Sequence, residues 1–482
     1  MNNFTAPVSG TFGFLVSFTE DKLMKMIYNV EDKPKFGQLI VFAIQQLLAI
    51  MAATLVVPVI INGNAGLTGD DAMSTAAALF GAGIGTLVYI LFTKHKSPVF
   101  LGSSFAFIGS MSAAFAGAAS VSVGYVGLLL GAVFAGLVYV IIAIIVKIVG
   151  VDWINRLMPP VVIGPTVSII GLSLAGNAIG DLQTVNTDGG AVNLAILCGI
   201  ITLIVTTLCS TYGKKTTKLI PFIIGILCGY AFAAILTFIG YSAGIDALKI
   251  GDFSPLSNLV ADGVNVSTFF SVPSFTFLHA LGGFKELSGA YIGTVAAAYV
   301  PVALVVFAEH IADHKNISSI IEKDLLDNPG LSRTLLGDGI GSMAGAFFGG
   351  CPNTTYGESV ACVAITRNAS VATLVATAVG AILISFLSPF VAFVNSIPSC
   401  VMGGVCMALY GFIAVSGLKM VQTVDLNANR NLFVVSAILI SGIGGLTLNF
   451  GQVSITAVAA SLILGIIINL LLSKEKPETE EE

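Results

Sequence analysis

Long apolar runs follow one another along almost the whole chain and constrain its fold more than any other feature. A helix that crosses a bilayer needs about 20 apolar residues. The runs, two of them short, lie at 38–61, 72–93, 99–116, 123–147, 158–178, 191–210, 218–240, 289–312, 333–350, 354–366, 370–394, 397–418, 431–448 and 454–472. Only 10% of the 482 residues are charged, against about 25% in soluble domains. We therefore predict an all-α polytopic membrane protein with 14 transmembrane segments.

Lysine and arginine are distributed unevenly between the connecting loops. If the N-terminus is cytoplasmic and every run crosses once, all but Lys249 and Lys285 of the 21 Lys and Arg residues fall on the cytoplasmic side. Cytoplasmic loops carry such an excess, and leaving out the two short runs would mix the two sides. We expect a plasma or inner membrane protein with both termini (1–36 and 473–482) cytoplasmic and a long extracellular loop at 241–288.

Two stretches that lie seven runs apart are similar to each other. MPPVVIGPTVSIIGLSLAG (158–176) and IPSCVMGGVCMALYGFIAVSG (397–417) share a proline at the second position and a Val-x-Gly step. Because Gly and Pro recur in many membrane helices, this match alone is weak, but the two short runs are also third and tenth in order. An odd number of crossings reverses orientation, as in the inverted repeats of transporters. We predict two inverted seven-segment repeats.

Both short runs contain residues that interrupt a helix. Pro352 lacks an N–H group, and residues 354–356 favour an extended backbone, so helix can begin only near Gly357 and continue to Thr366. The stretch PVFLGSSFAF at 98–107 has a similar character. Extended residues need partners for their backbone groups. We predict that segments 3 and 10 contain short strands that cross side by side, each followed by a half-helix.

Two glutamates lie inside the apolar runs. Glu309 is near the end of GAYIGTVAAAYVPVALVVFAEHIADH, and Glu358 is in the first turn of the predicted second half-helix. A carboxylate in hydrocarbon costs roughly 3 kcal/mol, so it normally faces a cavity and marks a substrate or ion path. Interrupted helices are tolerated where they line such a cavity. The combination indicates a secondary transporter, and no nucleophile–base pair or metal cluster at useful spacing suggests an enzyme.

Other polar residues lie close to Glu309 in the sequence. A carboxyl group that is protonated in one state and ionised in another can couple proton entry to substrate entry, which is our hypothesis for Glu309. Alternatively, Glu309 is a helix-end residue that reaches the cytoplasm. His310 and Asp338 are candidates for proton coupling, although His310 could be structural and Asp338 a helix cap. Asp313 is four residues after Glu309 and lies on the same helical face.

Further candidates and exclusions come from other parts of the chain. Gln45 and Gln46 are buried amides that bind either the protein core or the substrate, and Phe105 either packs internally or covers a ligand ring. Lys and Arg are absent from the broken segments before Arg367, which favours an uncharged substrate. The chain has no basic patch for nucleic acid and no GxxxxGK[ST] loop for ATP. We expect no cofactor and no metal.

Several motifs together resemble one known family. They are FGQLIVFAIQQLLAIMAATLVVP near the start, LGSSFAF (101–107), FAEHIADH (307–314), DNPGLSRTLLGDGIGSMAGAFFGG after it, and PNTTYGES (352–359). This set is similar to the nucleobase–cation symporters, a family that also includes ascorbate transporters, and most similar to its uracil permease branch. The resemblance covers roughly residues 35–472 and rests on specific motifs.

The resemblance implies an architecture and an activity. The architecture is 14 segments in two inverted repeats, with a core domain (37–150 and 289–395), a gate domain (151–240 and 396–472) and assembly as a homodimer in the lipid bilayer. The implied activity is proton-coupled import of uracil or a closely related nucleobase. In that family the glutamates that match Glu309 and Glu358 hold the pyrimidine ring. Backbone groups at the positions of Phe105, Tyr356 and Gly357 complete the site.

Three positions depart from the family pattern. The usual Gln-His of the first segment is Gln45-Gln46, a frequent histidine is Asp313, and the usual asparagine after the second glutamate is Ser359. These departures leave the preferred base open. The alternatives are a purine (xanthine or urate) symporter of the same family, or an anion exchanger or channel of the same inverted-repeat fold.

Overall fold

A computed structural model describes residues 26–472, except 151, 152, 154–156, 215, 262, 451 and 452. The predicted tail 473–482 and most of the predicted N-terminal segment 1–36 lie outside the described residues. The remainder of that N-terminal segment runs beside the chain that follows residue 366. There the N–H of Ile27 donates to the carbonyl of Arg367 at 2.8 Å, and the N–H of Val371 donates to that of Val30 at 3.1 Å.

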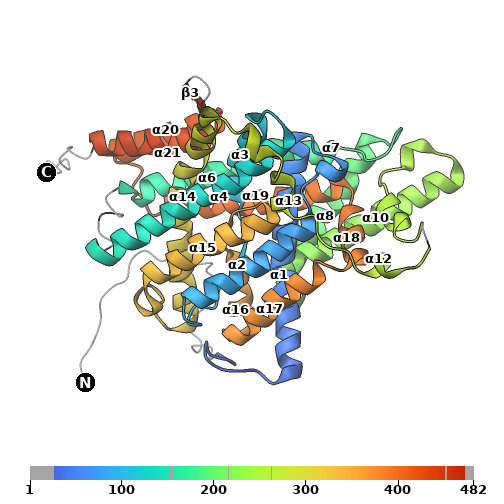
Figure 1. Cartoon of the computed structure of the whole chain (residues 1–482), viewed down its shortest axis with the longest axis horizontal. Coiled ribbons are helices and arrows are strands. Elements are labelled where there is room, and N and C mark those ends of the chain that lie inside the picture. The colour runs from blue at the N-terminus through green and yellow to red at the C-terminus, as the bar shows by residue number, and fades with distance from the viewer. Residues whose placement is uncertain are drawn as a thin grey trace.

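Helices account for most of the described chain (Figure 1). The first half contains α1 (Phe36–Ala65), α2 (Thr75–Phe92), α3 (Ile108–Ala116), α4 (Val121–Val149), α6 (Pro160–Ser173), α7 (Ala175–Gln183), α8 (Val192–Tyr212), α9 (Thr216–Leu219) and α10 (Pro221–Ala243). The second half contains α14 (Gly289–Ile321), α15 (Leu331–Gly349), α16 (Gly357–Thr366), α17 (Val371–Ile384), α18 (Ser388–Asn395), α19 (Ser399–Val421), α20 (Asn429–Ile443) and α21 (Ala457–Leu471). Among the described residues, eight helices are long and apolar enough to cross a membrane, and five shorter helices are also apolar.

Short elements fill the connections. The loop predicted at 241–288 contains α11 (Ser254–Asn258), α12 (Val266–Phe269) and α13 (Thr276–Ala280). Single turns are η1 (Gly69–Asp71), η2 (Phe105–Phe107), η3 (Asp246–Leu248), η4 (Gly283–Glu286) and η5 (Leu326–Gly330). The strands are β1 (Leu101–Ser103), β2 (Asn353–Thr355), β3 (Leu448–Phe450) and β4 (Val453–Ile455).

Every predicted apolar run contains at least one helix, but some ends differ from the prediction. The run 370–394 is divided into α17 and α18, because Pro389 lies in the first turn of α18, where a proline is favourable at the start of a new helix. The run 158–178 continues into α7 after a break at Leu174. The hairpin of β3 and β4, in which Leu448 pairs with Ile455, was not predicted and occupies the connection between two apolar runs.

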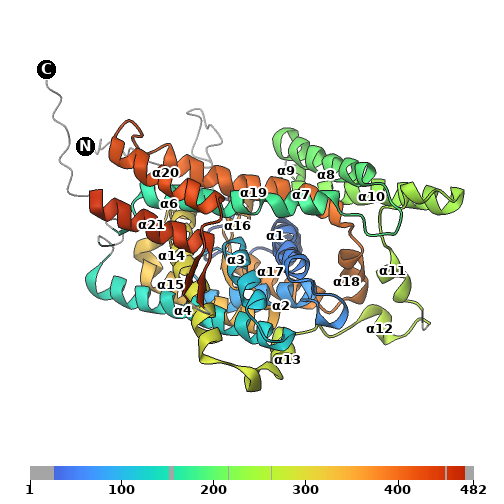
Figure 2. The ribbon, with the colours of Figure 1, turned by 90° about the horizontal axis from the view of Figure 1, so that it is seen from above.

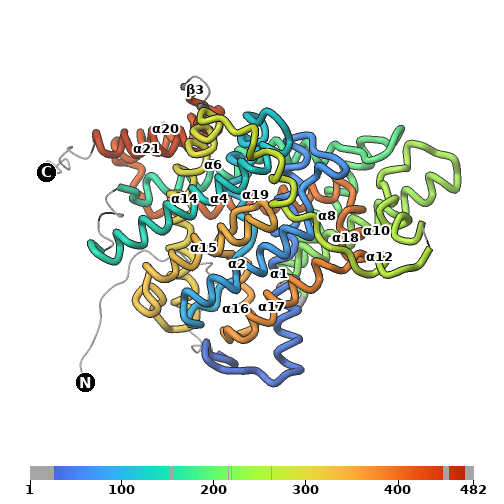
Figure 3. The backbone as a smooth tube through the Cα atoms, in the orientation of Figure 1, coloured from blue at the N-terminus to red at the C-terminus, as the bar shows by residue number. Residues whose placement is uncertain are grey.

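The helix contacts repeat with an offset of seven predicted segments. α2 packs on α15, and α6 packs on α19. α4 also contacts α15 just as α17 contacts α2, and the pair α8–α10 corresponds to the pair α20–α21. Segments from the two halves of the chain therefore interleave, as the blue and orange stretches of Figure 3 show. In Figure 2, α6, α7, α19 and α20 form a row on one side, and α2, α4, α15 and α17 lie on the other.

A close contact between α2 and α15 explains one part of the glycine pattern. A Cβ atom at Gly341 on α15 would lie 2.7 Å from the carbonyl oxygen of Gly85 on α2. Real Cβ atoms do not approach backbone so closely, so glycine is required for these helices to touch. Small residues serve the same purpose in membrane helix packing generally, where close approach supplies the dispersion contacts.

Candidate functional site

The predicted pair of short strands is present and fully buried. β1 and β2 are antiparallel, with Gly102 opposite Thr354. Two further bonds extend the ladder, from Ser104 N–H to the Pro352 carbonyl at 2.9 Å and from Tyr356 N–H to the Phe100 carbonyl at 3.1 Å. The strands thus satisfy each other's backbone groups without water, which is the condition for irregular backbone inside a membrane protein.

Helix α16 begins at Gly357, directly after β2, as the sequence predicted. The first amides of a helix have no acceptor within the helix, and the N-terminal end carries a partial positive charge. Glu358 lies in this first turn and is half-buried. A Cβ atom at Gly357 would have only Asp313 Oδ1, 4.0 Å away, as a neighbour, so the backbone here faces open space. These amides can donate to a polar ligand.

Three carboxyl groups converge at this point. Glu309 and Asp313 lie one turn apart on α14, and both are half-buried. Asp313 Oδ2 accepts a hydrogen bond of 2.7 Å from the hydroxyl of Thr355 at the end of β2. Helix α16 packs on α14, and its first residue, Gly357, lies beside Asp313, so Glu358 in the same turn is next to this part of α14. The structure thus brings together the two predicted glutamates and Asp313, and among the described residues no Lys or Arg forms an ion pair with any of them.

Phe105 lies beside this region at the start of η2 and is half-buried. Its ring contacts that of Tyr410 on α19 edge to face, with centroids 6.0 Å apart. Tyr410 is buried and was not predicted, because nothing in its sequence surroundings distinguishes it from other apolar helix positions. The contact therefore joins the chain that follows β1 to helix α19.

Tyr356 has a different environment from the other predicted site residues. Its ring packs against the backbone of Gly102, where an added Cβ would come within 2.3 Å of the ring. Its hydroxyl donates to the Ser103 carbonyl at 2.7 Å, and its backbone amide donates to the Phe100 carbonyl. The side chain is only 4% exposed. Tyr356 therefore holds the strand pair together, and its ring, hydroxyl and amide are already committed to protein partners.

Two positions that depart from the family pattern contact each other. The side-chain nitrogen of Gln46 lies 2.5 Å from Ser359 Oγ. The same oxygen accepts a 3.1 Å hydrogen bond from the Phe100 amide. Both side chains are buried. Their hydrogen bonds link α1 to α16 and to Phe100, the residue before β1. The neighbouring Gln45 is half-buried, and its side-chain oxygen has no partner among the described residues.

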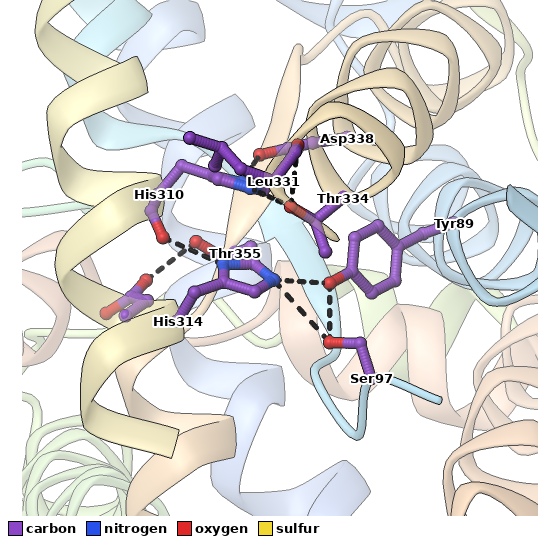
Figure 4. Close-up of polar contacts among 9 residues, drawn as sticks. Tyr89, Ser97, His310, His314, Leu331, Thr334, Asp338 and Thr355 are labelled. Carbon is purple, nitrogen blue, oxygen red and sulfur yellow. Dashed lines mark hydrogen bonds and ion pairs between the residues drawn. The ribbon is translucent and has the colours of Figure 1, made fainter. Parts of the chain in front are cut away.

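His310 and Asp338 form a fully buried pair (Figure 4). His310 Nδ1 lies 2.7 Å from Asp338 Oδ2. Its Nε2 lies 3.0 Å from Thr334 Oγ1, which donates to the Leu331 carbonyl. Asp338 Oδ1 has no partner among the described residues. The two predicted coupling residues thus contact each other. His310 directly follows Glu309 on α14, and Asp338 lies on α15.

Two hollows of the molecule lie elsewhere. One, of about 330 Å³, is lined by residues of α1, α3 and α4 that include Asn64, Ser112 and Phe115. The other, of about 280 Å³, is lined by residues from α18 and the loop before α13. Neither is lined by Glu309 or Glu358.

The fold is that of known multi-pass membrane transporters. The transmembrane domain of a cyanobacterium bicarbonate transporter, BicA, superposes with a TM-score of 0.56 at 15% identity, covering 92% of this chain and all of that one. The murine anion transporter Slc26a9 in its inward-facing state gives a TM-score of 0.59 at 10% identity, covering 92% of this chain and 69% of that one. Identities this low show the fold alone, an inverted-repeat transporter architecture.

Sequence comparison then gives the family. Residues 37–451 match the sequence profile of the Permease family (Xan_ur_permease). The uracil permease of Bacillus caldolyticus is 36% identical, with 93% of this chain and 95% of that protein covered, and that of Escherichia coli K12 is 35% identical with the same coverage. The putative pyrimidine permease RutG of E. coli K12 is 30% identical over 92% of each chain. The chain belongs to the Permease family, and it is a membrane permease and not an enzyme.

Proposed function

We propose that this permease is a proton-coupled symporter that imports uracil or a closely related nucleobase. The observation that carries the proposal is the convergence of Glu309, Asp313 and Glu358 beside the start of α16. Half-buried carboxyl groups in a membrane protein mark a substrate or proton path. The high similarity to uracil permeases over nearly the whole chain supports the choice of substrate class.

The chemistry of the groups suits a pyrimidine. Uracil presents alternating N–H donors and C=O acceptors along its edge. Carboxyl oxygens of Glu309 and Glu358 accept from N–H groups, the amide of Gly357 at the start of α16 donates to a carbonyl, and Phe105 covers a ring face. A base with the wrong edge leaves buried groups unpaired at a cost of about 1–3 kcal/mol each, so the site selects by hydrogen-bond pattern.

The proposed architecture has 14 crossings in two inverted repeats, with both termini in the cytoplasm of a plasma or inner membrane protein. The corresponding contacts of α2–α15 and α6–α19 support the repeat. The core domain would contain residues 37–150 and 289–395 and the gate domain 151–240 and 396–472, the two rows seen in Figure 2. Movement of one row against the other would expose the carboxyl groups alternately to each side. Assembly as a homodimer is part of the same proposal.

Glu309 would carry the coupling proton, with His310 and Asp338 behind it. The carboxyl must be protonated before the base binds, and its proton is released on the opposite side of the membrane. The flux of protons and the flux of the base are thereby linked. The direct test is uptake of radiolabelled uracil into vesicles with and without an inward proton gradient. We expect accumulation only with the gradient, and its loss on addition of an uncoupler. Gradient-independent equilibration would contradict coupling.

Variants assign the role within that assay. Glu309→Gln keeps the shape but cannot ionise, so we expect facilitated exchange of uracil without gradient-driven accumulation. Glu322→Gln is the matched control, because Glu322 is exposed at the end of the same helix. Accumulation by Glu309→Gln equal to that of the control would show that Glu309 does not carry the proton.

Two alternatives are decided by the same vesicles. Preference for xanthine or urate over uracil would identify a purine symporter. Bicarbonate, sulfate or chloride flux would identify an anion exchanger or channel, as the fold of the solved neighbours allows. Absence of any Lys or Arg paired with the three carboxyl groups in the described residues favours an uncharged base over an anion.

A further inference from the structure

His314 was not predicted to matter, yet it stands at the centre of the buried polar cluster in Figure 4. It lies one turn after His310 on α14, and both imidazoles are fully buried. Their rings are stacked, with centroids 4.0 Å apart and planes inclined by 28°. Tyr89 on α2 and Ser97 in the loop before β1 complete the cluster, and both are also fully buried.

The partners of His314 determine which of its nitrogens carries hydrogen. Its Nδ1 lies 2.8 Å from the backbone carbonyl of His310, which can only accept, so Nδ1 must donate. In a neutral ring Nε2 then accepts, and the Tyr89 hydroxyl is 2.6 Å away to donate. The Tyr89 oxygen in turn accepts from the Ser97 hydroxyl at 2.6 Å. Donation therefore runs in one direction, from Ser97 through Tyr89 to His314.

This chain of hydrogen bonds ends at a carbonyl group. A backbone carbonyl cannot take up a proton and pass it on, so the path through His314 does not continue to His310. Two stacked imidazoles at this distance also cannot both be charged, since like charges in low dielectric repel strongly. His310, in contrast, faces the Asp338 carboxyl, which accepts when ionised and donates when protonated, while the Thr334 hydroxyl, whose hydrogen goes to the Leu331 carbonyl, accepts from His310 Nε2. Only His310 has partners that accommodate a change of one proton.

We propose that His314 is a positioning residue: it stays neutral and holds His310 against Asp338, so that the exchangeable proton of this cluster belongs to the His310–Asp338 pair. Its bond to Tyr89 ties α14 to α2, and its bond to the His310 carbonyl fixes the turn that carries Glu309. The proposal rests on the proposed function only in assuming that the His310–Asp338 pair takes part in proton coupling.

The titratable groups around His314 come from four elements. His310 and Asp313 lie on α14, Asp338 on α15, Tyr89 on α2, and Tyr139 on α4, whose ring is 6.3 Å from that of His310. Asp313 is bonded to Thr355 and Asp338 to His310. Among the described residues neither carboxylate forms a hydrogen bond with His314, so no negative partner stabilises a charged His314 ring.

The first experiment reads the protonation of His314 without any transport. The chain has only four histidines, so ¹⁵N-histidine solid-state NMR of the protein in liposomes can resolve them, with His314→Gln assigning the signal. We expect one neutral form with hydrogen on Nδ1 from pH 5 to 8. Hydrogen on Nε2, or a charged ring within that range, would overturn the proposal. This result stands even if the chain transports another substrate.

The second experiment separates positioning from proton relay during uracil uptake. His314→Gln cannot carry a proton, but its amide oxygen can accept from Tyr89, so we expect the pH profile to be kept and the rate to stay within about threefold. His314→Phe keeps a stacked ring and loses both bonds, so we expect the pH of half-maximal uptake to move by about one unit. His95→Asn, in an exposed loop, is the control.

Two outcomes of the uptake experiment would contradict the proposal. An unchanged pH profile in His314→Phe would mean that the two hydrogen bonds of His314 do not position His310. Loss of proton dependence in His314→Gln would mean that His314 itself relays the proton. If the wild-type chain shows no proton-dependent uptake of uracil at all, the proposed function fails, and the NMR measurement alone decides the role of His314.

Discussion

The two interrupted segments have similar backbones and different chemistry. After β1 the chain continues as Phe105-Ala106-Phe107 and then α3, whereas after β2 it continues as Gly357-Glu358-Ser359 within α16. The first copy offers apolar rings and backbone. The second offers a carboxyl group, a hydroxyl group and an uncovered helix start. One copy of the repeat thus covers the candidate site, and the other supplies its polar groups.

The surroundings of the two copies differ in the same way. The ring of Phe105 contacts that of Tyr410 on α19, so the first copy depends on a contact with the row of helices that contains α19. Glu358 lies in the first turn of α16, which packs on α14 and starts beside Asp313. The polar half of the candidate site therefore comes from helices that contact each other directly, whereas its apolar cover includes a contact with α19.

The largest effect should follow removal of the charge that only the second copy has. We expect Glu358→Gln to lower uracil uptake by about 10- to 100-fold, since a hydrogen bond to a charged group contributes about 1.5–3 kcal/mol. Equilibrium binding of radiolabelled uracil to the purified protein would measure the part of this loss that comes from weaker binding. Ala106→Ser, at the matching place in the first copy, should change binding by less than about threefold. Equal losses would show that the copies are not specialised.

A second prediction concerns the packing of the strand pair. Gly102 supports the Tyr356 ring, and its Cβ would overlap that ring at 2.3 Å. We expect Gly102→Ala to destabilise the protein by about 1–3 kcal/mol, as overpacking does in other cores. Gly109 in α3 is the matched control, because a Cβ there meets nothing within 4 Å. Thermal unfolding in detergent would compare the two variants, and equal melting temperatures would contradict the assigned role of Tyr356.

Much of the fold could be predicted from the sequence because membranes impose simple rules. Length and apolarity located the helices, and Pro352 with its β-favouring successors located the strand before Gly357. The hairpin of β3 and β4 was missed because its residues extend apolar runs on both sides. The break at Pro389 was missed because a membrane helix can contain proline, as α14 does at Pro301.

The candidate site was less predictable than the fold. Glu309 and Glu358 were found because carboxyl groups are rare in apolar runs. Tyr410, Thr355 and His314 were not, since each acquires its position through contacts between elements far apart in sequence. For His314 the spacing of four from His310 was a signal, because such residues stack on one helical face.

A third prediction tests whether the two neighbouring departures from the family pattern form a unit. Gln46 and Ser359 touch at 2.5 Å. A histidine reaches less far than an extended glutamine, and an asparagine reaches further than a serine, so the exchanges offset each other. We expect Gln46→His and Ser359→Asn each to weaken uracil binding about fivefold, and the double variant to recover most of both losses, which is a coupling energy of about 1.5–2 kcal/mol.

The double-mutant cycle is measured by equilibrium binding of radiolabelled uracil. Gln45→His serves as the control, since the side-chain oxygen of Gln45 has no hydrogen-bond partner among the described residues. Additive losses in the double variant would mean that the two positions act separately. The segment formed by β2 and α16 would then be held in place by its pairing with β1 and not by the contact between Gln46 and Ser359.

The smallest effect should come from the exposed ends of the two half-helices. The end of α3 is tied through Asn64, which accepts from Asn177 on α7 and donates to Ser112, each at 3.1 Å. The end of α16 is tied by backbone bonds to Ile27. Because an exposed hydrogen bond contributes at the lower end of the usual range, about 0.5 kcal/mol, Asn177→Ala should change the uptake rate by about threefold or less. A loss above tenfold would place the control of movement at this outer contact, and the difference between the two copies would then lie in their ends and not in their polar groups.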